Sequence, residues 1–168
     1  MAMTLVSTVT VGSGGASSAE FTNIPQTGKD LLILYSLRSN TGTATTDAFE
    51  YRYNNNSTAN AYQVNQLGAT TGVNPNAFSS TANFAGSING NGTTANTFGN
   101  GSIYIANYAG STQKASSVDN VSENNSSSGA ERSITANNWN NTAAITSVNF
   151  IPNNGFGQHS TFSLYIIS

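Results

Sequence analysis

The sequence predicts an all-β protein, a β-sandwich or closed barrel of about eight to nine short strands with almost no helix. Apolar and polar residues alternate in most runs, and period two is typical of a half-buried strand. NG, GNG and GST turn signals separate these runs at intervals of roughly ten residues. Helix formers are scarce, because 25 Asn, 23 Ser, 21 Thr and 16 Gly make up half of the 168 residues. These residues compete with or weaken helical backbone.

Alternation predicts a strand at five places along the chain. The apolar side of each run is expected to face the core. The alternating residues are Val9 and Val11; Phe49, Tyr51 and Tyr53; Tyr62 and Val64; Ile103 and Ile105, with Tyr104 on the opposite side; and Phe162, Leu164 and Ile166.

Three more strands are predicted from other features. LLILYSL (31–37) is a continuous apolar run, which indicates a strand buried on both faces. TSVNFIP (146–152) predicts a strand that ends at Pro152.

The third of these, 115–123, reads ASSVDNVSE, with Val118 and Val121 three residues apart. Strict alternation fails there, so we expect a bulge or bend near Asp119 in a strand with a polar outer face. Flexible loops are predicted at 38–47, 85–101 and 124–129.

The length fits one domain, residues 1–168. Within it, residues 1–20 read as an N-terminal strand and a Gly/Ser-rich joint, and residues 21–168 as the core module. Residues 3–11 fit two roles: the first strand of the sandwich, or an arm that pairs with a neighbouring subunit by strand addition. The sequence leaves both roles open.

Charge and composition exclude several classes of partner. The five Lys or Arg and seven Asp or Glu give a net charge of −2, and so few cations make no nucleic-acid-binding stripe. Without Cys there is neither a disulfide framework nor a thiolate metal site. The N-terminus does not resemble a signal peptide, and no window approaches eighteen consecutive apolar residues. We therefore expect a soluble protein with no membrane partner.

The titratable residues form no catalytic or metal-binding pattern, so we expect no enzyme and no cofactor. His159 is the only histidine, and a general base also needs a positioned nucleophile and an orienting acid. In a strand, Asp119 and Glu123 share a face but lie about 13 Å apart by strand rise. Asn-rich loops can hold calcium through carbonyl groups, so a loop calcium site remains an alternative to plain solvated turns.

Three aromatic residues are candidates for contact with a ligand. Trp139 stands among four Asn residues, and Tyr104 and Tyr108 flank the NYAG turn. Aromatic faces beside amides can bind sugars, because the apolar sugar face stacks on the ring while amides meet the hydroxyl groups. The alternative is that Trp139 anchors a loop to the core.

Four segments together resemble a family of small virion proteins of tailed bacteriophages. They are FTNIPQTGKDLLILYSLRSN (21–40), GSIYIANYAGSTQKASSVDNVSENN (101–125), WNNTAAITSVNFIPNNG (139–155) and STFSLYII (160–167). The resemblance implies a jelly-roll-like sandwich that assembles as a homotrimer on the virus particle. The family has no established functional residues to carry over.

Two functions are compatible with this resemblance. The first is a capsid decoration (cement) protein, bound to the major capsid protein on the outer surface of the head. The alternative is a receptor-binding tail fibre or tip module that recognises host surface glycan. A fibre tip usually needs an anchoring stalk with heptad pattern, and none precedes residue 21, which favours decoration. Either role places the protein in the virion, assembled in the cytoplasm of the bacterial host.

Overall fold

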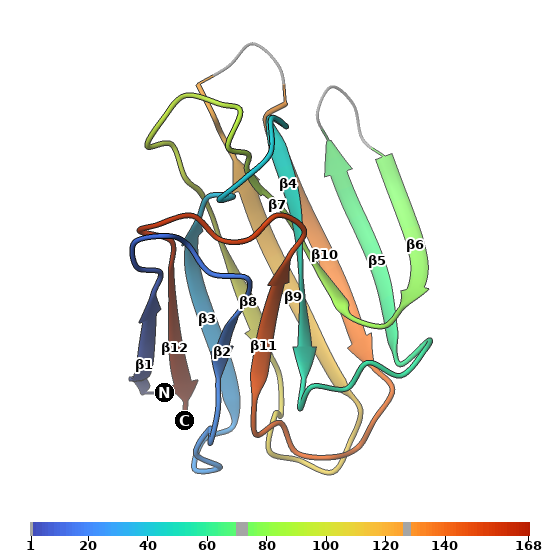
Figure 1. Cartoon of the computed structure of the whole chain (residues 1–168). Coiled ribbons are helices and arrows are strands. Elements are labelled where there is room, and N and C mark those ends of the chain that lie inside the picture. Colours follow the sequence, from blue (N-terminus) through green and yellow to red (C-terminus); the bar gives the residue numbers. More distant parts are fainter. Residues whose placement is uncertain (1, 70–73, 126–128) are drawn as a thin grey trace.

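The computed structural model describes residues 2–69, 74–125 and 129–168, which form an antiparallel β-sandwich (Figure 1). An eight-stranded sheet has the order β1-β12-β3-β8-β9-β10-β5-β6, and a four-stranded sheet has the order β2-β11-β4-β7. No helix occurs among the described residues, so none is present that is long and apolar enough to cross a membrane. The strands are β1 (Met3–Thr10), β2 (Ala19–Phe21), β3 (Asp30–Leu37), β4 (Thr46–Tyr53), β5 (Tyr62–Ala69), β6 (Asn74–Ser80), β7 (Asn83–Asn89), β8 (Gly99–Ile105), β9 (Lys114–Ser122), β10 (Glu131–Trp139), β11 (Val148–Pro152) and β12 (Thr161–Ile167).

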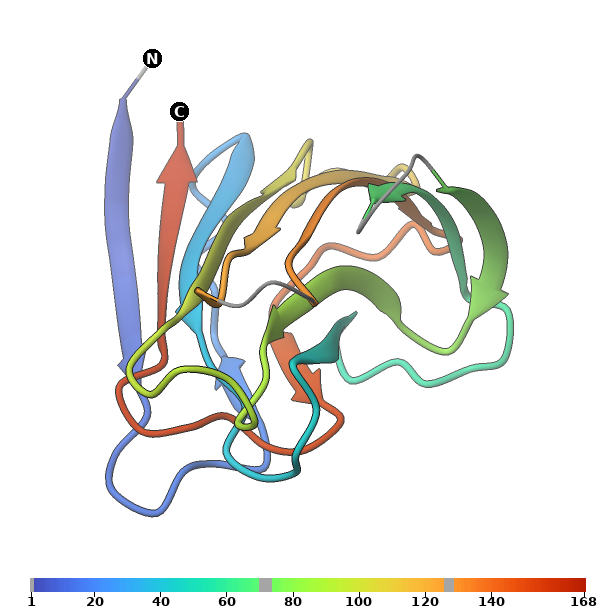
Figure 2. The ribbon, with the colours of Figure 1, turned by 90° about the horizontal axis from the view of Figure 1, so that it is seen from above.

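The strand order is that of a jelly roll with two added hairpins. Without β5–β6 and β9–β10, the sheets reduce to β1-β12-β3-β8 and β2-β11-β4-β7, the double Greek-key arrangement of a jelly roll. Both hairpins join the larger sheet beyond β8, and this sheet arches over the smaller one (Figure 2). The predicted sandwich is confirmed, with twelve strands rather than eight or nine.

The five alternating runs all lie in or at the end of strands, but two other strand predictions were wrong in detail. The run 31–37 is not buried on both faces: Leu34 points outward and is 40% exposed. The register of β9 against β8 and β10 is unbroken, so the bulge expected near Asp119 is absent. Val118 is buried and Val121 lies on the opposite, exposed face. The sequence missed β2, β6, β7 and β10 altogether.

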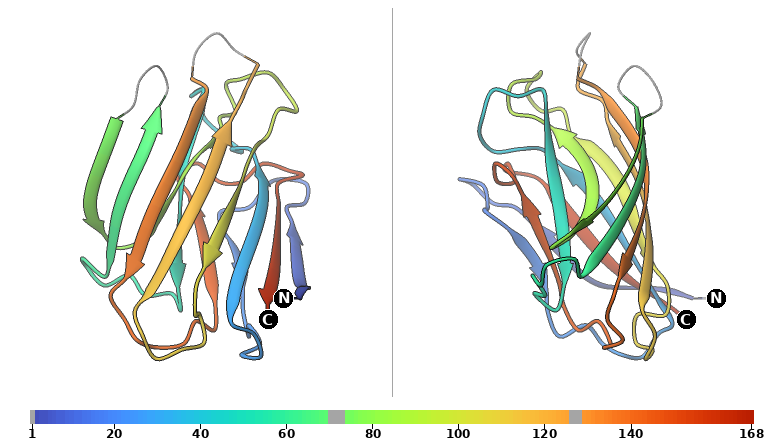
Figure 3. Two further views of the ribbon diagram at one scale, coloured as in Figure 1. Left: turned by 180° about the vertical axis from the view of Figure 1, so that it is seen from behind. Right: turned by 90° about the vertical axis from the view of Figure 1, so that its right-hand side faces the viewer.

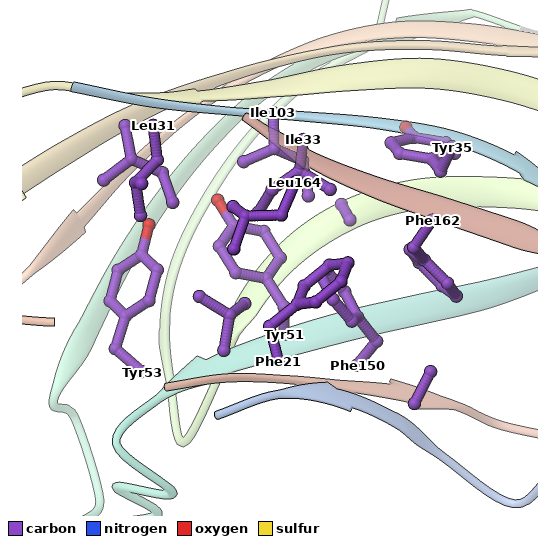
Figure 4. Packing of buried hydrophobic residues seen from close by; sticks show 14 of the residues in the cluster. Phe21, Leu31, Ile33, Tyr35, Tyr51, Tyr53, Ile103, Phe150, Phe162 and Leu164 are labelled. Atoms are coloured by element: carbon purple, nitrogen blue, oxygen red, sulfur yellow. The ribbon is translucent and has the colours of Figure 1, made fainter. Parts of the chain in front are cut away.

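Aromatic rings fill the half of the interior between β12-β3-β8 and β2-β11-β4. Phe150 and Phe162 come from opposite sheets and stack with ring centroids 4.3 Å apart (Figure 4). Tyr35 meets Phe49 edge-on at 5.1 Å, again from opposite sheets. Each such ring removes about 150–250 Å² from water, so this half is held by hydrophobic burial.

The other half, between β7 and β9-β10, is closed by hydrogen bonds from buried amides. Asn120 Nδ2 donates to the Ser87 carbonyl at 2.8 Å, and its Oδ1 accepts from the Tyr35 hydroxyl at 2.9 Å. Asn137 Nδ2 donates to the Phe84 carbonyl at 3.1 Å, and its Oδ1 accepts from the Phe84 N–H at 3.2 Å. Because buried polar groups cost free energy unless they are paired, these bonds determine how β7 lies on β9 and β10.

The close approach of β7 to β9 depends on a glycine. A Cβ at residue 86 would lie 2.7 Å from the side chain of Asn120, and Gly86 has φ +114°, a conformation that other residues rarely adopt. The register between β4 and β7 shifts at the same point, next to Phe49. A bulge therefore brings β7 down onto β9.

The loop between β7 and β8 is folded around the guanidinium group of Arg38. The side chain donates hydrogen bonds of 3.0–3.2 Å to carbonyl oxygens of Asn91, Thr93, Thr94 and Thr97 and to the hydroxyls of Thr93 and Thr97. Burial lowers the pKa of Arg38. Carbonyl dipoles here take the place of a carboxylate partner.

The predicted loops need correction at their ends. Strand β7 occupies the start of 85–101 and β8 its end, and β4 begins inside 38–47. The parts of these strands that lie inside the predicted loops contain few apolar residues. The predicted loop at 124–129 includes 126–128, which lie outside the described residues.

Within this chain, residues 3–10 form the first strand of the sandwich, which is one of the two roles predicted for residues 3–11. Strand β1 pairs antiparallel with β12, from Met3 opposite Ile167 to Thr10 opposite Thr161. The Gly/Ser-rich joint is tied to the rest of the chain, because Ala16 and Phe156 exchange backbone hydrogen bonds of 2.9 and 2.7 Å. The N-terminal segment is thus part of the sandwich.

Replacing Phe162 with Ala is expected to lower the free energy of unfolding by about 3–5 kcal/mol, since the ring is fully buried against Phe150. Urea denaturation followed by tryptophan fluorescence measures the change. Ile134→Ala is the control, because Ile134 is 62% exposed; we expect it to shift the free energy by less than about 1 kcal/mol. Equal losses for the two variants would contradict the assigned core.

Alkaline pH is expected to unfold the protein. Burial raises the pKa of Tyr62 to about 12 and raises those of Tyr35, Tyr51 and Tyr53 as well. In the unfolded chain these phenols ionise near pH ~10, so their contribution to stability is complete below that pH and is lost as pH rises above it. Ultraviolet titration should show the buried phenols ionising together with loss of the β-sheet circular dichroism signal. Full ionisation while the fold persists would contradict the burial.

Candidate functional site

The first part of strand β10 has two hydroxyl side chains inside and an isoleucine outside. Ser133 and Thr135 are buried, whereas Ile134 between them is 62% exposed. A shift of one residue in register would bury Ile134 and expose its two neighbours. An exposed isoleucine beside buried hydroxyls is the reverse of what folding alone favours.

The register of β10 is held by its C-terminal half. Trp139 packs edge-on against Tyr53, with centroids 5.5 Å apart, and stacks on Tyr62 at 6.4 Å. Asn137 makes its two bonds to the backbone of Phe84. Because period two couples all positions of a strand, these contacts force Ile134 outward.

Ile134 lines a hollow on the outer face of the eight-stranded sheet, the face turned away from the smaller sheet. Leu67 of β5 is paired directly opposite Ile134, and Val121 of β9 lies opposite Arg132. These side chains and Asp119 border a hollow of about 330 Å³. We call it the Ile134 hollow, with Leu67, Val121, Ile134, Asp119 and Arg132 as its members.

Exposed apolar side chains continue across the rest of this outer face. Those of the described residues all belong to strands of the eight-stranded sheet: Met3, Leu5, Leu34, Leu67, Tyr104, Val121 and Ile134. The outward positions of the smaller sheet include Glu20, Glu50 and Arg52. The exposed large apolar side chains of the described residues are therefore confined to one face of the sandwich, where they lie among polar ones. Exposed apolar patches often mark interaction sites.

The Ile134 hollow also carries two of the few charges of the chain. Asp119 and Arg132 are exposed there, and neither has a hydrogen-bond or ion-pair partner in the described part of the chain. Other charged groups stabilise turns instead: Asp47 accepts from the backbone N–H of Asn154 at 3.1 Å. Buried Lys114 donates to backbone carbonyls of the neighbouring turns.

The three aromatic candidates lie in different environments. Tyr104 is on the outer face, 38% exposed, and its hydroxyl donates to Asp30 Oδ2 at 2.7 Å. Tyr108 is fully buried, and its hydroxyl donates to the Pro25 carbonyl. Trp139 is 1% exposed. The prediction that Tyr108 and Trp139 contact a ligand at the surface is therefore corrected, because both rings are buried in the interior.

The amides near Trp139 are also engaged. Asn138 Nδ2 donates to Gln113 Oε1 at 2.9 Å, and Asn140 Oδ1 accepts from Gln113 Nε2 at 2.7 Å. These three side chains form a surface chain of hydrogen bonds, and Asn137 points into the core. The cluster of Asn residues therefore stabilises strand ends.

His159 lies in a turn and Glu123 lies directly after β9, and neither belongs to a cluster of side chains that could bind a metal ion among the described residues. His159 is exposed in a turn with φ 71°, and Glu123 accepts a hydrogen bond from the Asn125 N–H at 2.8 Å. Within residues 2–69, 74–125 and 129–168, no group of three or more His, Asp or Glu side chains is placed to hold a metal ion.

The sequence contained one signal for the Ile134 hollow. The spacing of Val118 and Val121 does place them on opposite faces of one regular strand, and an outward Val121 indicates an apolar outer face. A bulge at this spacing would instead place both valines in the core, and the unbroken register of β9 contradicts it. The sequence around Ile134 and Leu67 does not predict that they face outward. Which side of ERSITANN faces the core depends on its pairing with β9.

A scan of protein-family models, a search of curated proteins and a search of solved structures each find no match to this chain.

Replacing Tyr104 with Phe is expected to lower the free energy of unfolding by about 1 kcal/mol, because Asp30 is buried and loses one of its hydrogen bonds. Tyr165→Phe is a matched control on the same face, because the Tyr165 hydroxyl makes no hydrogen bond to the described part of the chain. Urea denaturation of both variants measures the difference. Equal stability of the two variants would show that the Tyr104–Asp30 bond contributes nothing.

Proposed function

We propose that the protein is a bacteriophage virion structural protein, a capsid decoration protein that docks on the outer surface of the head. The apolar outer face of the eight-stranded sheet, with Ile134 at its most exposed point, is the observation that carries the proposal. The resemblance of four segments to small phage virion proteins is the reason for proposing a virus particle as the site of assembly. The partner is then the major capsid protein, and the protein acts by binding rather than by catalysis.

Protein docking fits this face better than glycan binding does. Sugar sites combine exposed aromatic faces with free amides. Here Trp139 and Tyr108 are buried, the hydroxyl of the exposed Tyr104 is bonded to Asp30, and the amides of Asn138 and Asn140 are paired. The Ile134 hollow instead offers three aliphatic side chains beside the charges of Asp119 and Arg132, a composition that suits the core of a protein interface.

High copy number suits such a surface. A homotrimer, as the resemblance implies, would present three docking faces, so each contact can be modest and the total still strong. Apolar contacts also depend little on salt, because few charges are involved. This favours a protein that braces a shell in media of varied ionic strength.

The test is co-sedimentation of the purified protein with capsids that lack it. Ile134→Lys is expected to weaken binding roughly tenfold or more, since burying an isoleucine is worth about 1.5–3 kcal/mol and each 1.4 kcal/mol is about tenfold. Ile151→Lys is the matched control, because Ile151 lies on the outer face of the smaller sheet, opposite Glu50. It should bind as the unchanged protein does.

Decoration also requires saturation at a stoichiometry tied to capsomer number. Absence of binding to capsids, together with saturable binding to host cells, would instead establish the receptor-binding alternative. Equal binding by the Ile134 and Ile151 variants would remove the outer face as the docking surface.

A further inference from the structure

Strand β1 is the least protected edge of the two sheets. It is eight residues long, and nothing lies beyond it in Figure 1 or in the rear view of Figure 3. The other edges are blunted: β6 contains Pro75, β2 has three residues, and β7 bends at Gly86. No charged residue precedes Glu20. Natural sheets usually protect such an edge with charge, proline or a covering segment, because its free backbone groups pair readily with another strand.

The free backbone groups of β1 can be identified from its pairing with β12. Ala2 and Ser168 exchange both backbone hydrogen bonds, at 3.1 and 3.0 Å. Alternation in an antiparallel ladder then directs the N–H and C=O of Met3 and Leu5 away from β12. At the other end, Val11 N–H donates to Ser160 at 2.8 Å.

Because the backbone N–H of Val11 faces β12, alternation directs the backbone N–H and C=O of Thr8 and Thr10 away from β12 as well. Between the two halves, the register shifts at Val6. The outward residues are thus 3, 5, 8 and 10, with gaps of two, three and two.

The order of these gaps is the same from either end of the strand. A regular strand, with gaps of two throughout, can match only half of the edge. The β1 strand of a second copy, in antiparallel orientation, can pair with the whole edge, because its three-residue gap lies opposite the gap of the first copy. We propose that two copies of this chain pair through β1, about a two-fold axis between Val6 and Ser7, with Met3 opposite Thr10 and Leu5 opposite Thr8.

The side chains of β1 favour this occupant. Met3 and Leu5 are 56% and 53% exposed in the single chain, and pairing covers part of both. Since β1 is uncharged, no like charges meet across the axis. A two-fold contact is isologous, so each hydrogen bond formed occurs twice. The pairing does not depend on the function proposed above.

The first test is the molecular mass in solution by sedimentation velocity. The unchanged chain is expected to contain two copies, or six where trimers also form. Thr8→Pro removes an outward N–H and leaves the β12 ladder intact. It should raise the dissociation constant about thirtyfold, because symmetry counts the lost bond twice. Leu5→Lys should act in the same direction, and Ala77→Lys, on the opposite edge strand β6, should have no effect.

The second test fixes the register and does not rely on weakened variants. The chain has no Cys, so single cysteines can be introduced at chosen positions. A mixture of Leu5→Cys and Thr8→Cys proteins should form a disulfide-linked pair under mild oxidation, because directly opposite residues lie about 5.5 Å apart, within disulfide range. Leu5→Cys alone, and Leu5→Cys mixed with Thr10→Cys, should cross-link at least tenfold less.

Masses of one or three chains at all concentrations up to several hundred micromolar (about the upper range of the method) would overturn the proposal. So would pairs that survive both Thr8→Pro and Leu5→Lys, or cross-linking without preference for the Leu5–Thr8 combination. Circular dichroism of each variant confirms that the comparison is made between folded proteins.

Discussion

The buried amides that join β7 to β9 and β10 are the constraint on which the rest of the structure depends. Half of the chain is Asn, Ser, Thr and Gly, so apolar side chains alone cannot fill the space between an eight-stranded and a four-stranded sheet. The side chains of Asn120 and Asn137 occupy part of this space and make hydrogen bonds to the backbone of β7. Such bonds are directional, unlike hydrophobic contacts, and they therefore fix one register for β9 and β10.

That fixed register explains the apolar outer face. Since Asn120 and Asn137 must point inward, Val121 and Ile134 must point outward. In the single chain, Val121 and Ile134 stay exposed so that Asn120 and Asn137 can make their hydrogen bonds to β7. In the proposed interface the same two side chains would be buried, so their outward direction would cost the assembled protein less free energy than it costs the free one.

The sequence predicted the aromatic half of the fold and failed in the polar half. In β4 and β12 the inward residues other than Asp47 are Phe, Tyr, Leu and Ile, so the alternation of apolar and polar residues is clear. In β7 and β10 the inward residues include Asn83, Ser133 and Thr135, so the contrast between the faces is absent or reversed. The inward direction of these residues follows from contacts that Asn120, Asn137 and Trp139 make with distant parts of the chain. A pattern within one segment does not contain that information. For the same reason the sequence selected Trp139 as a surface candidate and overlooked Ile134.

The two proposed contacts are geometrically compatible. Residues 3, 5, 8 and 10 of β1 carry their side chains on the outer face, as the pairing of Met3 with Ile167 and of Thr8 with Ser163 requires. An antiparallel pair of identical edge strands has its two-fold axis perpendicular to the sheet. The outer faces of both copies then point to the same side, and two Ile134 hollows would face one shell together. Docking of the second hollow becomes intramolecular once the first is bound, so strand pairing at one end of the sheet strengthens docking at the other without any new contact.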